Sequence, residues 1–226
     1  MNKAIRILRD EHRSLAAVLH GLQHLAQAAQ DATVRPRFEV FRAMIRYIDE
    51  FPERLHHPKE DAYLFARLVA RAPETRPLID ALRAEHVESA KRVRDLEHAL
   101  DEFERSWPHW SGAFLAEVED YVEFHRRHMR REELEVLPAA ERALTGDDWH
   151  AIEEAFAGND DPIADLREQD LAQLYTRIVS IAPAPIGLDV SPSAPRYQVI
   201  VVAFAAVTAS DAVAPLVIDE STGSTE

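Results

Sequence analysis

The sequence contains no cysteine and only six glycines among its 226 residues. The absence of cysteine excludes disulfides, thiolate zinc sites, cysteine-ligated iron–sulfur clusters and cysteine nucleophiles. The scarcity of glycine argues against a glycine-rich phosphate-binding loop. Basic residues are also few, with 26 Lys and Arg against 40 Asp and Glu, which gives a net charge of -14. Because nucleic acids and anionic membranes require a dense basic face, neither is an expected partner.

Long apolar runs are missing as well. The stretch 197–209 is uncharged and apolar, but it is too short to cross a hydrocarbon layer of about 30 Å. Its extension towards the C-terminus takes in Asp211, so a membrane anchor is not expected. The N-terminal segment carries Arg6 and Arg9 where a secretory signal needs an unbroken apolar core, and a cytoplasmic location is expected.

The segment from residue 2 to about 145 has helical hydrophobic periodicity and divides into four long parts. These parts cover about 2–30, 36–71, 76–105 and 110–145. Amphipathic helices joined by short connections are typical of antiparallel bundles. The predicted fold is therefore all-α, an antiparallel four-helix bundle with a short C-terminal helical extension and an unassigned tail.

The predicted organisation is a bundle domain over 1–146, a helical extension over 147–182, and a linker with a poorly assigned tail over 183–226. The fourth bundle helix is expected to end near Gly146, with this glycine as its C-cap. The extension is expected to hold a short helix over 147–156 and another from about 161 to 181. The stretch 197–209 has the β-branched composition of a strand, but the sequence offers it no partner strand.

Each apolar seam of the bundle is interrupted by side chains that can bind a metal ion. The interruptions are His12, His56 with Glu60, His86, and His128 with Glu132. At 1.5 Å per residue, His12 and His56 lie roughly 27 and 30 Å from the first connection. His86 and His128 lie roughly 28 and 27 Å from the third. In an antiparallel bundle all four interruptions therefore fall in one layer.

A layer of buried imidazoles and carboxylates is costly unless its groups are paired, and a metal centre would pair them. An imidazole and a carboxylate four residues apart lie on one helical face and can bind one ion. His56 with Glu60 and His128 with Glu132 have this spacing. Nitrogen and oxygen ligands without thiolate favour iron or manganese over structural zinc. Two carboxylates on different helices are suited to bridging a pair of ions.

Two segments carry a resemblance to a known family, YIDEFPERLHHPKEDAYLF (Tyr47 to Phe65) and YVEFHRRHMRREELEVLP (Tyr121 to Pro138). They are similar to the second- and fourth-helix motifs of hemerythrin-like (HHE cation-binding) domains, and the resemblance covers residues 1 to about 145. It implies a non-haem site with two carboxylate-bridged Fe ions, in preference to manganese or zinc. The implied terminal ligands are His12, His56, His86 and His128, and the implied bridges are Glu60 and Glu132.

The third helix departs from the family pattern. Oxygen-carrying members have a second histidine four residues after the first on this helix, where this sequence has Ala90. The site could hold an extra water, recruit His57 or His125, or lose one iron. His125 could instead be a hydrogen-bond donor behind the ligands. More open coordination favours reaction with peroxide or NO, or iron sensing, over simple O2 carriage.

Two further choices concern the motifs themselves. The i, i+4 spacing favours His56 over its neighbour His57 as a ligand, and Glu132 over Glu133. Pro52 and Pro58 each remove a backbone donor from the second helix. They predict either a kink that turns the motif inward or a loop that interrupts the helix.

The resemblance and the residues together predict a protein that binds or senses a small molecule or metal, namely O2, NO, peroxide or iron, in a stress response. The expected ligand is a small diatomic molecule or peroxide. One alternative is a di-iron peroxidase or an iron donor for iron–sulfur cluster repair. The other is a metal-free helical interaction module in which residues 147–190 dock a protein partner. The sequence leaves open whether the protein is an enzyme, and it identifies no protein partner.

Overall fold

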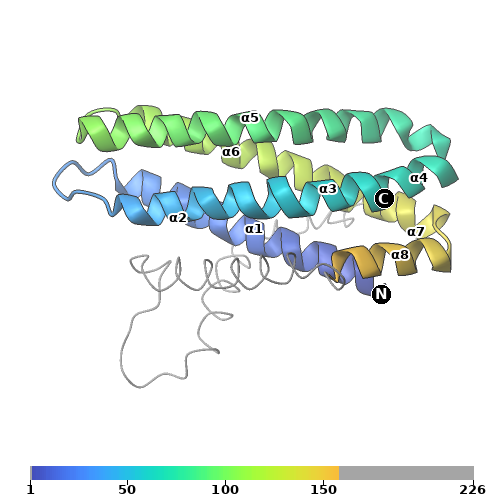
Figure 1. Ribbon diagram of the computed structural model, residues 1–226. Helices are drawn as coiled ribbons and strands as arrows, with labels where there is room; N and C mark the ends of the chain where they lie inside the picture. Colours follow the sequence, from blue (N-terminus) through green and yellow to red (C-terminus); the bar gives the residue numbers. More distant parts are fainter. Residues whose placement is uncertain (1, 158–226) are drawn as a thin grey trace, which may run out of the picture.

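The computed structural model describes residues 2–157, which form a bundle of four antiparallel helical arms (Figure 1). The first arm is α1 (Lys3–Ala28) and the third is α5 (Arg76–Ser106), which follows the short 3-10 turn η3 (Pro73–Thr75). The second arm consists of α2 (Phe38–Ile48), η1 (Asp49–His56), α3 (His57–Lys59), η2 (Glu60–Phe65) and α4 (Ala66–Arg71). The fourth consists of α6 (Ser111–Arg131), η4 (Glu132–Val136) and α7 (Leu137–Ala143). The prediction of an all-α bundle is confirmed, and residues 2–157 contain no strand.

The apolar core is divided into two clusters. The α2 cluster contains buried apolar residues from 15–29, from α2, from 93–103 and from 114–129. Within it, the rings of Phe41 and Phe114 lie 5.2 Å apart, edge to face. The α8 cluster is named after the helix α8 (Gly146–Phe156), which follows the fourth arm. It contains Ala4, Ile5, Leu8, Leu64, Phe65, Leu68, Val69, Ala72, Ile79, Leu82, Val136, Leu137, Ala140, Leu144, Ile152 and Phe156. The four predicted polar interruptions fall between the two clusters on every arm. Apolar packing above and below therefore holds the polar layer in place.

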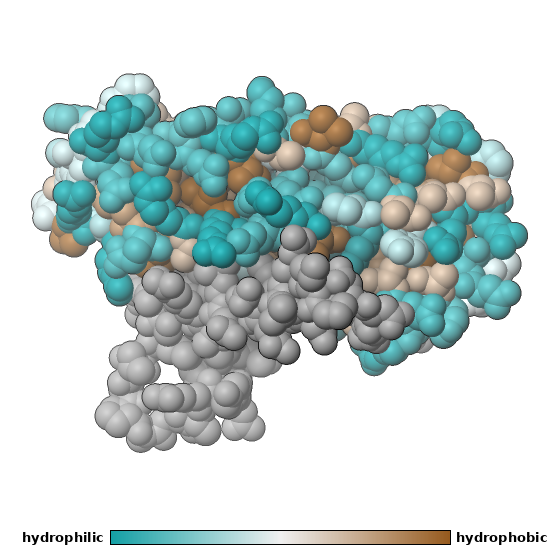
Figure 2. Space-filling view, in the orientation of Figure 1, coloured by the Kyte–Doolittle hydropathy of each residue, from teal (hydrophilic) through white to brown (hydrophobic). Residues whose placement is uncertain are grey.

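Outside the core, the face drawn in Figure 2 is largely hydrophilic, with scattered brown hydrophobic residues. Among residues 2–157, the large hydrophobic side chains that remain exposed are Val34, Tyr63, Val87, Trp110 and Leu134. Single exposed apolar residues are normal on a soluble surface. Within residues 2–157, no helix combines the length and the apolar character that crossing a membrane requires.

The two proline-containing stretches of the second arm are helical, so the interpretation as a loop is wrong. Pro52 lies inside the π-helical segment η1, and Pro58 lies in the first turn of α3. A π-helical segment changes the hydrogen-bond partners along a helix without breaking it. Three such segments occur in the described residues, and two of them begin at a motif carboxylate, η2 at Glu60 and η4 at Glu132.

The predicted C-cap at Gly146 is wrong. The fourth arm ends at Ala143, and Gly146 is the first residue of the next helix, α8 (Gly146–Phe156). The reason is a capping box, in which the Thr145 hydroxyl accepts the Asp148 N–H at 3.3 Å while Asp148 accepts the Thr145 N–H at 2.9 Å. The short helix predicted over 147–156 is present. The predicted helix to residue 181, the linker and the strand-like stretch lie outside the described residues.

Candidate metal centre

The structure brings the six predicted residues into one buried layer. They come from all four arms: His12 from α1, His56 from η1, Glu60 from η2, His86 from α5, His128 from α6 and Glu132 from η4. One ligand atom each of His12, His56, Glu60 and Glu132 lies within 4.8 Å of the others, and the same holds for Glu60, His86, His128 and Glu132. The two groups share both carboxylates. This is the donor arrangement that two ions bridged by two carboxylates require.

In each of the four histidines, Nε2 is the nitrogen that faces the shared carboxylates. The Nε2 atoms of His12 and His128 lie 3.3 and 3.2 Å from oxygens of Glu132. Nε2 of His56 lies 3.4 Å from Glu60 Oε1, and Nε2 of His86 lies 3.7 Å from Glu60 Oε2. The donor nitrogens of all four histidines therefore converge on the two carboxylates, at distances of 3.2 to 3.7 Å.

The opposite nitrogen, Nδ1, of each histidine faces an acidic side chain from another arm. The pairs are His56 with Glu11 at 2.7 Å, His86 with Asp61 at 3.3 Å, His128 with Glu85 at 2.8 Å and His12 with Glu133 at 3.1 Å. The first arm thus supports the second, the second the third, the third the fourth, and the fourth the first. We call this closed set of contacts the acid ring. A carboxylate on Nδ1 fixes the ring orientation of a metal-binding histidine and makes Nε2 a better ligand.

Basic residues stabilise two members of the acid ring. Arg131 bonds Glu85, and Arg83 lies 3.4 Å from Asp61. Burial raises the pKa of Glu85, but His128 and Arg131 outweigh it and hold that pKa below its usual value. Glu85 therefore stays ionised at neutral pH and orients His128.

Electrostatic interactions within the layer favour the charged forms of both the imidazoles and the carboxylates. Burial lowers the pKa of the imidazoles, but the neighbouring carboxylates outweigh it, and they raise the pKa of His12 and His86 to about 9 and that of His128 to about 10. Burial raises the pKa of Glu132, but the charge of His128 and the contact with His12 hold it well below its usual range. In the absence of a metal, protons on the imidazoles balance the buried carboxylates.

Several atoms that face the centre have no hydrogen bond, whereas Nε2 of His86 and Nε2 of His128 lie within hydrogen-bond distance of each other, at 3.1 Å. Among the described residues, no hydrogen bond reaches Nε2 of His12 and His56, Oε2 of Glu60, or either carboxylate oxygen of Glu132. Buried polar atoms without partners are rare and costly in native proteins. Bound cations would satisfy all of them, so the residues present fit a pair of metal ions.

The two histidines considered for the missing position lie in different surroundings. A ring nitrogen of His57 lies within 4.8 Å of ring nitrogens of His86 and His128. His125 is fully buried, and its Nε2 lies 2.9 Å from the Ser89 hydroxyl oxygen. Burial, with the charge of His128, lowers the pKa of His125 to about 3, so this imidazole is neutral.

The acid ring was missed from the sequence, although it leaves a signal there. Each of its members is the immediate neighbour of a predicted ligand: Glu11 precedes His12, Asp61 follows Glu60, Glu85 precedes His86 and Glu133 follows Glu132. Each acid, however, supports a histidine on a different arm. The pairing therefore depends on how the arms are arranged around the bundle.

The comparison with known families agrees with this geometry. The family model for the hemerythrin HHE cation binding domain matches residues 3–140, more than half of the chain. No curated protein matches the chain. The matched region ends just after the last motif and encloses the whole polar layer. The chain therefore belongs to the family of hemerythrin HHE cation-binding domains.

Proposed function

We propose that the protein is a non-haem di-iron protein that binds or senses a small molecule, O2, NO or peroxide, or iron itself. The observation that carries this proposal is the pair of four-residue groups that share Glu60 and Glu132. His12 and His56 would hold one ion, and His86 and His128 the other. Imidazole and carboxylate ligands without sulfur suit iron at such a centre. Bound iron would supply reversible redox chemistry and a position for a small ligand.

The metal-free interaction module is the weaker alternative. A docking surface needs no buried charge, whereas this layer buries four imidazoles and two carboxylates with their donor atoms turned inward. Such a layer weakens a bundle unless it binds something. Whether the protein only binds its small ligand or converts it, as a peroxidase does, depends on which molecules reach the ions.

The proposal is tested by counting iron. Protein loaded anaerobically with Fe(II) and desalted is expected to hold two iron ions per chain and, after exposure to air, to show near-ultraviolet charge-transfer absorption. Removal of the iron by a chelator is expected to lower the melting temperature, because an ion that binds only the folded state stabilises it by about 4 kcal/mol at a thousand times its Kd. Absence of iron after reconstitution, with a melting temperature that the chelator leaves unchanged, would favour the interaction module.

A groove between α1 and α6 reaches His12, one of the six predicted ligands. It has a volume of about 580 Å³, and its lining includes His12, Arg13, Ala16, Arg126 and Met129. His12 is the one residue of the polar layer in this lining. A groove of this size admits O2, NO or peroxide, so we propose it as the entrance for the small ligand.

Filling the groove is expected to slow ligand entry. Ala16→Phe adds a ring to its wall, and we expect the rate of azide binding to the oxidised, iron-loaded protein to fall about tenfold while the iron content stays at two. Stopped-flow absorption measures this rate. Ala84→Phe, on the exposed side of α5, is the matched control and should leave the rate unchanged. Equal rates in both variants would place the entrance elsewhere.

A further inference from the structure

His57 is a buried histidine that the proposed ligand set does not use. Its side chain is 4% exposed, and its Nδ1 has no hydrogen-bond partner among the described residues. The nearest acid is Glu53, one turn earlier on the same arm, with Oε2 3.5 Å away. The other oxygen of this carboxylate, Oε1, accepts a hydrogen bond from the Ser89 hydroxyl. The Nδ1 side of the ring therefore has only a long contact with an acid.

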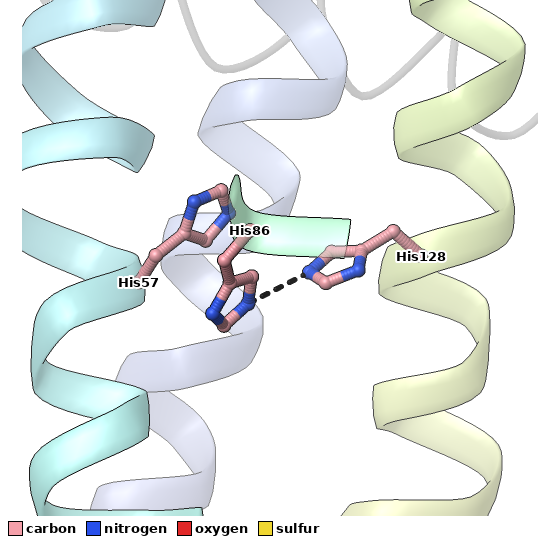
Figure 3. A group of neighbouring side chains, drawn as sticks. All are labelled: His57, His86 and His128. Carbon is pink, nitrogen blue, oxygen red and sulfur yellow. Dashed lines mark hydrogen bonds between the residues drawn. The ribbon is translucent and has the colours of Figure 1, made fainter. Parts of the chain in front are cut away.

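The His57 ring also lies beside two of the proposed ligands. Its ring lies face to face with that of His86, with the ring centres 4.1 Å apart, and the ring centre of His128 lies 5.4 Å away (Figure 3). One nitrogen of each ring lies within 4.8 Å of one nitrogen of the other two. Figure 3 shows the three rings converging from three different arms. The three imidazoles are close enough to share one ion, and because the lone pairs lie in the ring planes, one of the two stacked rings must turn for both to bind it.

The orientation of Nδ1 also groups His57 with the proposed ligands. His12, His56, His86 and His128 each turn Nδ1 towards an acid, and His57 turns Nδ1 towards Glu53. In all five histidines, Nε2 is therefore the ring nitrogen that lies away from the acid. His125 lacks this arrangement, because its Nε2 is taken up by a 2.9 Å contact with the Ser89 hydroxyl oxygen. His125 is also absent from every group of converging ligand atoms found in residues 2–157.

We propose that His57 is a third imidazole ligand of the ion held by His86 and His128, and that it replaces the histidine missing at Ala90. This inference rests on the proposed di-iron function and extends it. The two ions then have unequal surroundings. Three imidazoles and the two shared carboxylates surround one ion, whereas the ion at His12 and His56 has two imidazoles and the same carboxylates. The ion with fewer ligands is the one beside the groove.

The assignment separates the roles of the two ions. Of the proposed ligands of the two ions, only His12 lines the groove, and it belongs to the ion for which the protein supplies fewer donors. The other ion is enclosed by imidazoles from the second, third and fourth arms. Exogenous ligands are therefore expected to bind the ion at His12 and His56, and the ion at His57 acts as its partner.

The test compares His57→Phe with His125→Phe. Phenylalanine keeps a planar ring against His86 but removes the nitrogens, so packing changes little. The purified apo proteins are titrated anaerobically with Co(II), and the number of ions, their affinities and the visible spectrum of bound Co(II) are recorded. We expect two ions in the wild type and in His125→Phe, whereas in His57→Phe the second ion should bind at least tenfold more weakly and its spectrum should change. His57→Asn serves if the phenylalanine variant does not fold.

The outcomes separate this inference from the proposal on which it rests. Two ions with wild-type affinity and spectrum in His57→Phe would overturn the role of His57 and leave the two-ion site intact. A weaker second ion in His125→Phe with an unchanged His57→Phe would assign the replacement to His125. Failure of the wild type to bind two ions would overturn the two-ion site itself.

Discussion

Glu132→Gln is expected to remove tight binding of both ions, although it changes only one atom of one side chain. Glu132 belongs to both four-residue groups, with oxygens 3.3 Å from His12 and 3.2 Å from His128. Glutamine keeps the shape but loses the charge and one of the two acceptor oxygens. We expect the iron content to fall from two per chain to below one, with a loss of affinity of at least about 100-fold. Elemental analysis after desalting measures the first quantity, and metal titration the second.

Glu133→Gln is the matched control, because the two glutamates are adjacent and only one faces the centre. The Glu133 side chain is 39% exposed and touches His12 through Nδ1, on the far side of the imidazole. Loss of a supporting carboxylate typically reduces metal affinity by about 10- to 100-fold. We expect this variant to retain two ions and to hold the one at His12 more weakly. If the two variants lost the same amount of metal, Glu132 would not be a bridge.

Metal loading is expected to release protons and to become tighter as the pH rises. The metal-free protein has raised pKa values at His12 and His86, about 9, and at His128, about 10, so these imidazoles are protonated at pH 7. Only neutral imidazole binds a metal ion, and each of these protons must leave. Calorimetric titration in two buffers with different ionisation enthalpies counts the protons. A release near zero at pH 7, or an affinity that stays constant from pH 6 to 9, would contradict this account.

The same shifts determine how the metal-free protein responds to alkali. Because the three pKa values are raised by folding, the stabilisation from the charged imidazoles is complete below the unfolded value of 6.5 and is lost as the pH rises through 9 to 10. The free energy of unfolding of the metal-free protein should therefore fall above pH 9. Urea unfolding at several pH values measures the decline, and the metal-loaded protein should not show it in that range.

Much of the fold and the centre of the site can be predicted from the sequence because they depend on regular helix geometry. The seams fixed the faces that pack together, and the rise per residue placed His12, His56, His86 and His128 in one layer. The π-helical segments could not be predicted this way, since they alter local hydrogen bonding while leaving the apolar pattern readable. Gly146 was assigned to the wrong helix because a glycine after an apolar seam resembles a C-cap, whereas the capping box of Thr145 and Asp148 determines the boundary.

The surroundings that distinguish His57 from His125 could not be predicted from the sequence for a different reason. His57 is one residue from the predicted ligand His56, and His125 is three residues from the predicted ligand His128. Both are buried. Their difference lies in neighbours from another arm, the Ser89 hydroxyl for His125 and the rings of His86 and His128 for His57. Contacts between arms depend on the order and rotation of the helices, which hydrophobic spacing alone does not define.

The acid ring has a consequence for protein design. A helix that carries an HxxxE motif brings an imidazole and a carboxylate, but the acid that orients the imidazole belongs to the neighbouring helix. Grafting one motif into an unrelated bundle would therefore transfer the ligands without their orientation. A transplant that preserves the site has to move the four helices in their original cyclic order, with Glu11, Asp61, Glu85 and Glu133 included. The unit that can be transferred is the whole cross-section of the bundle.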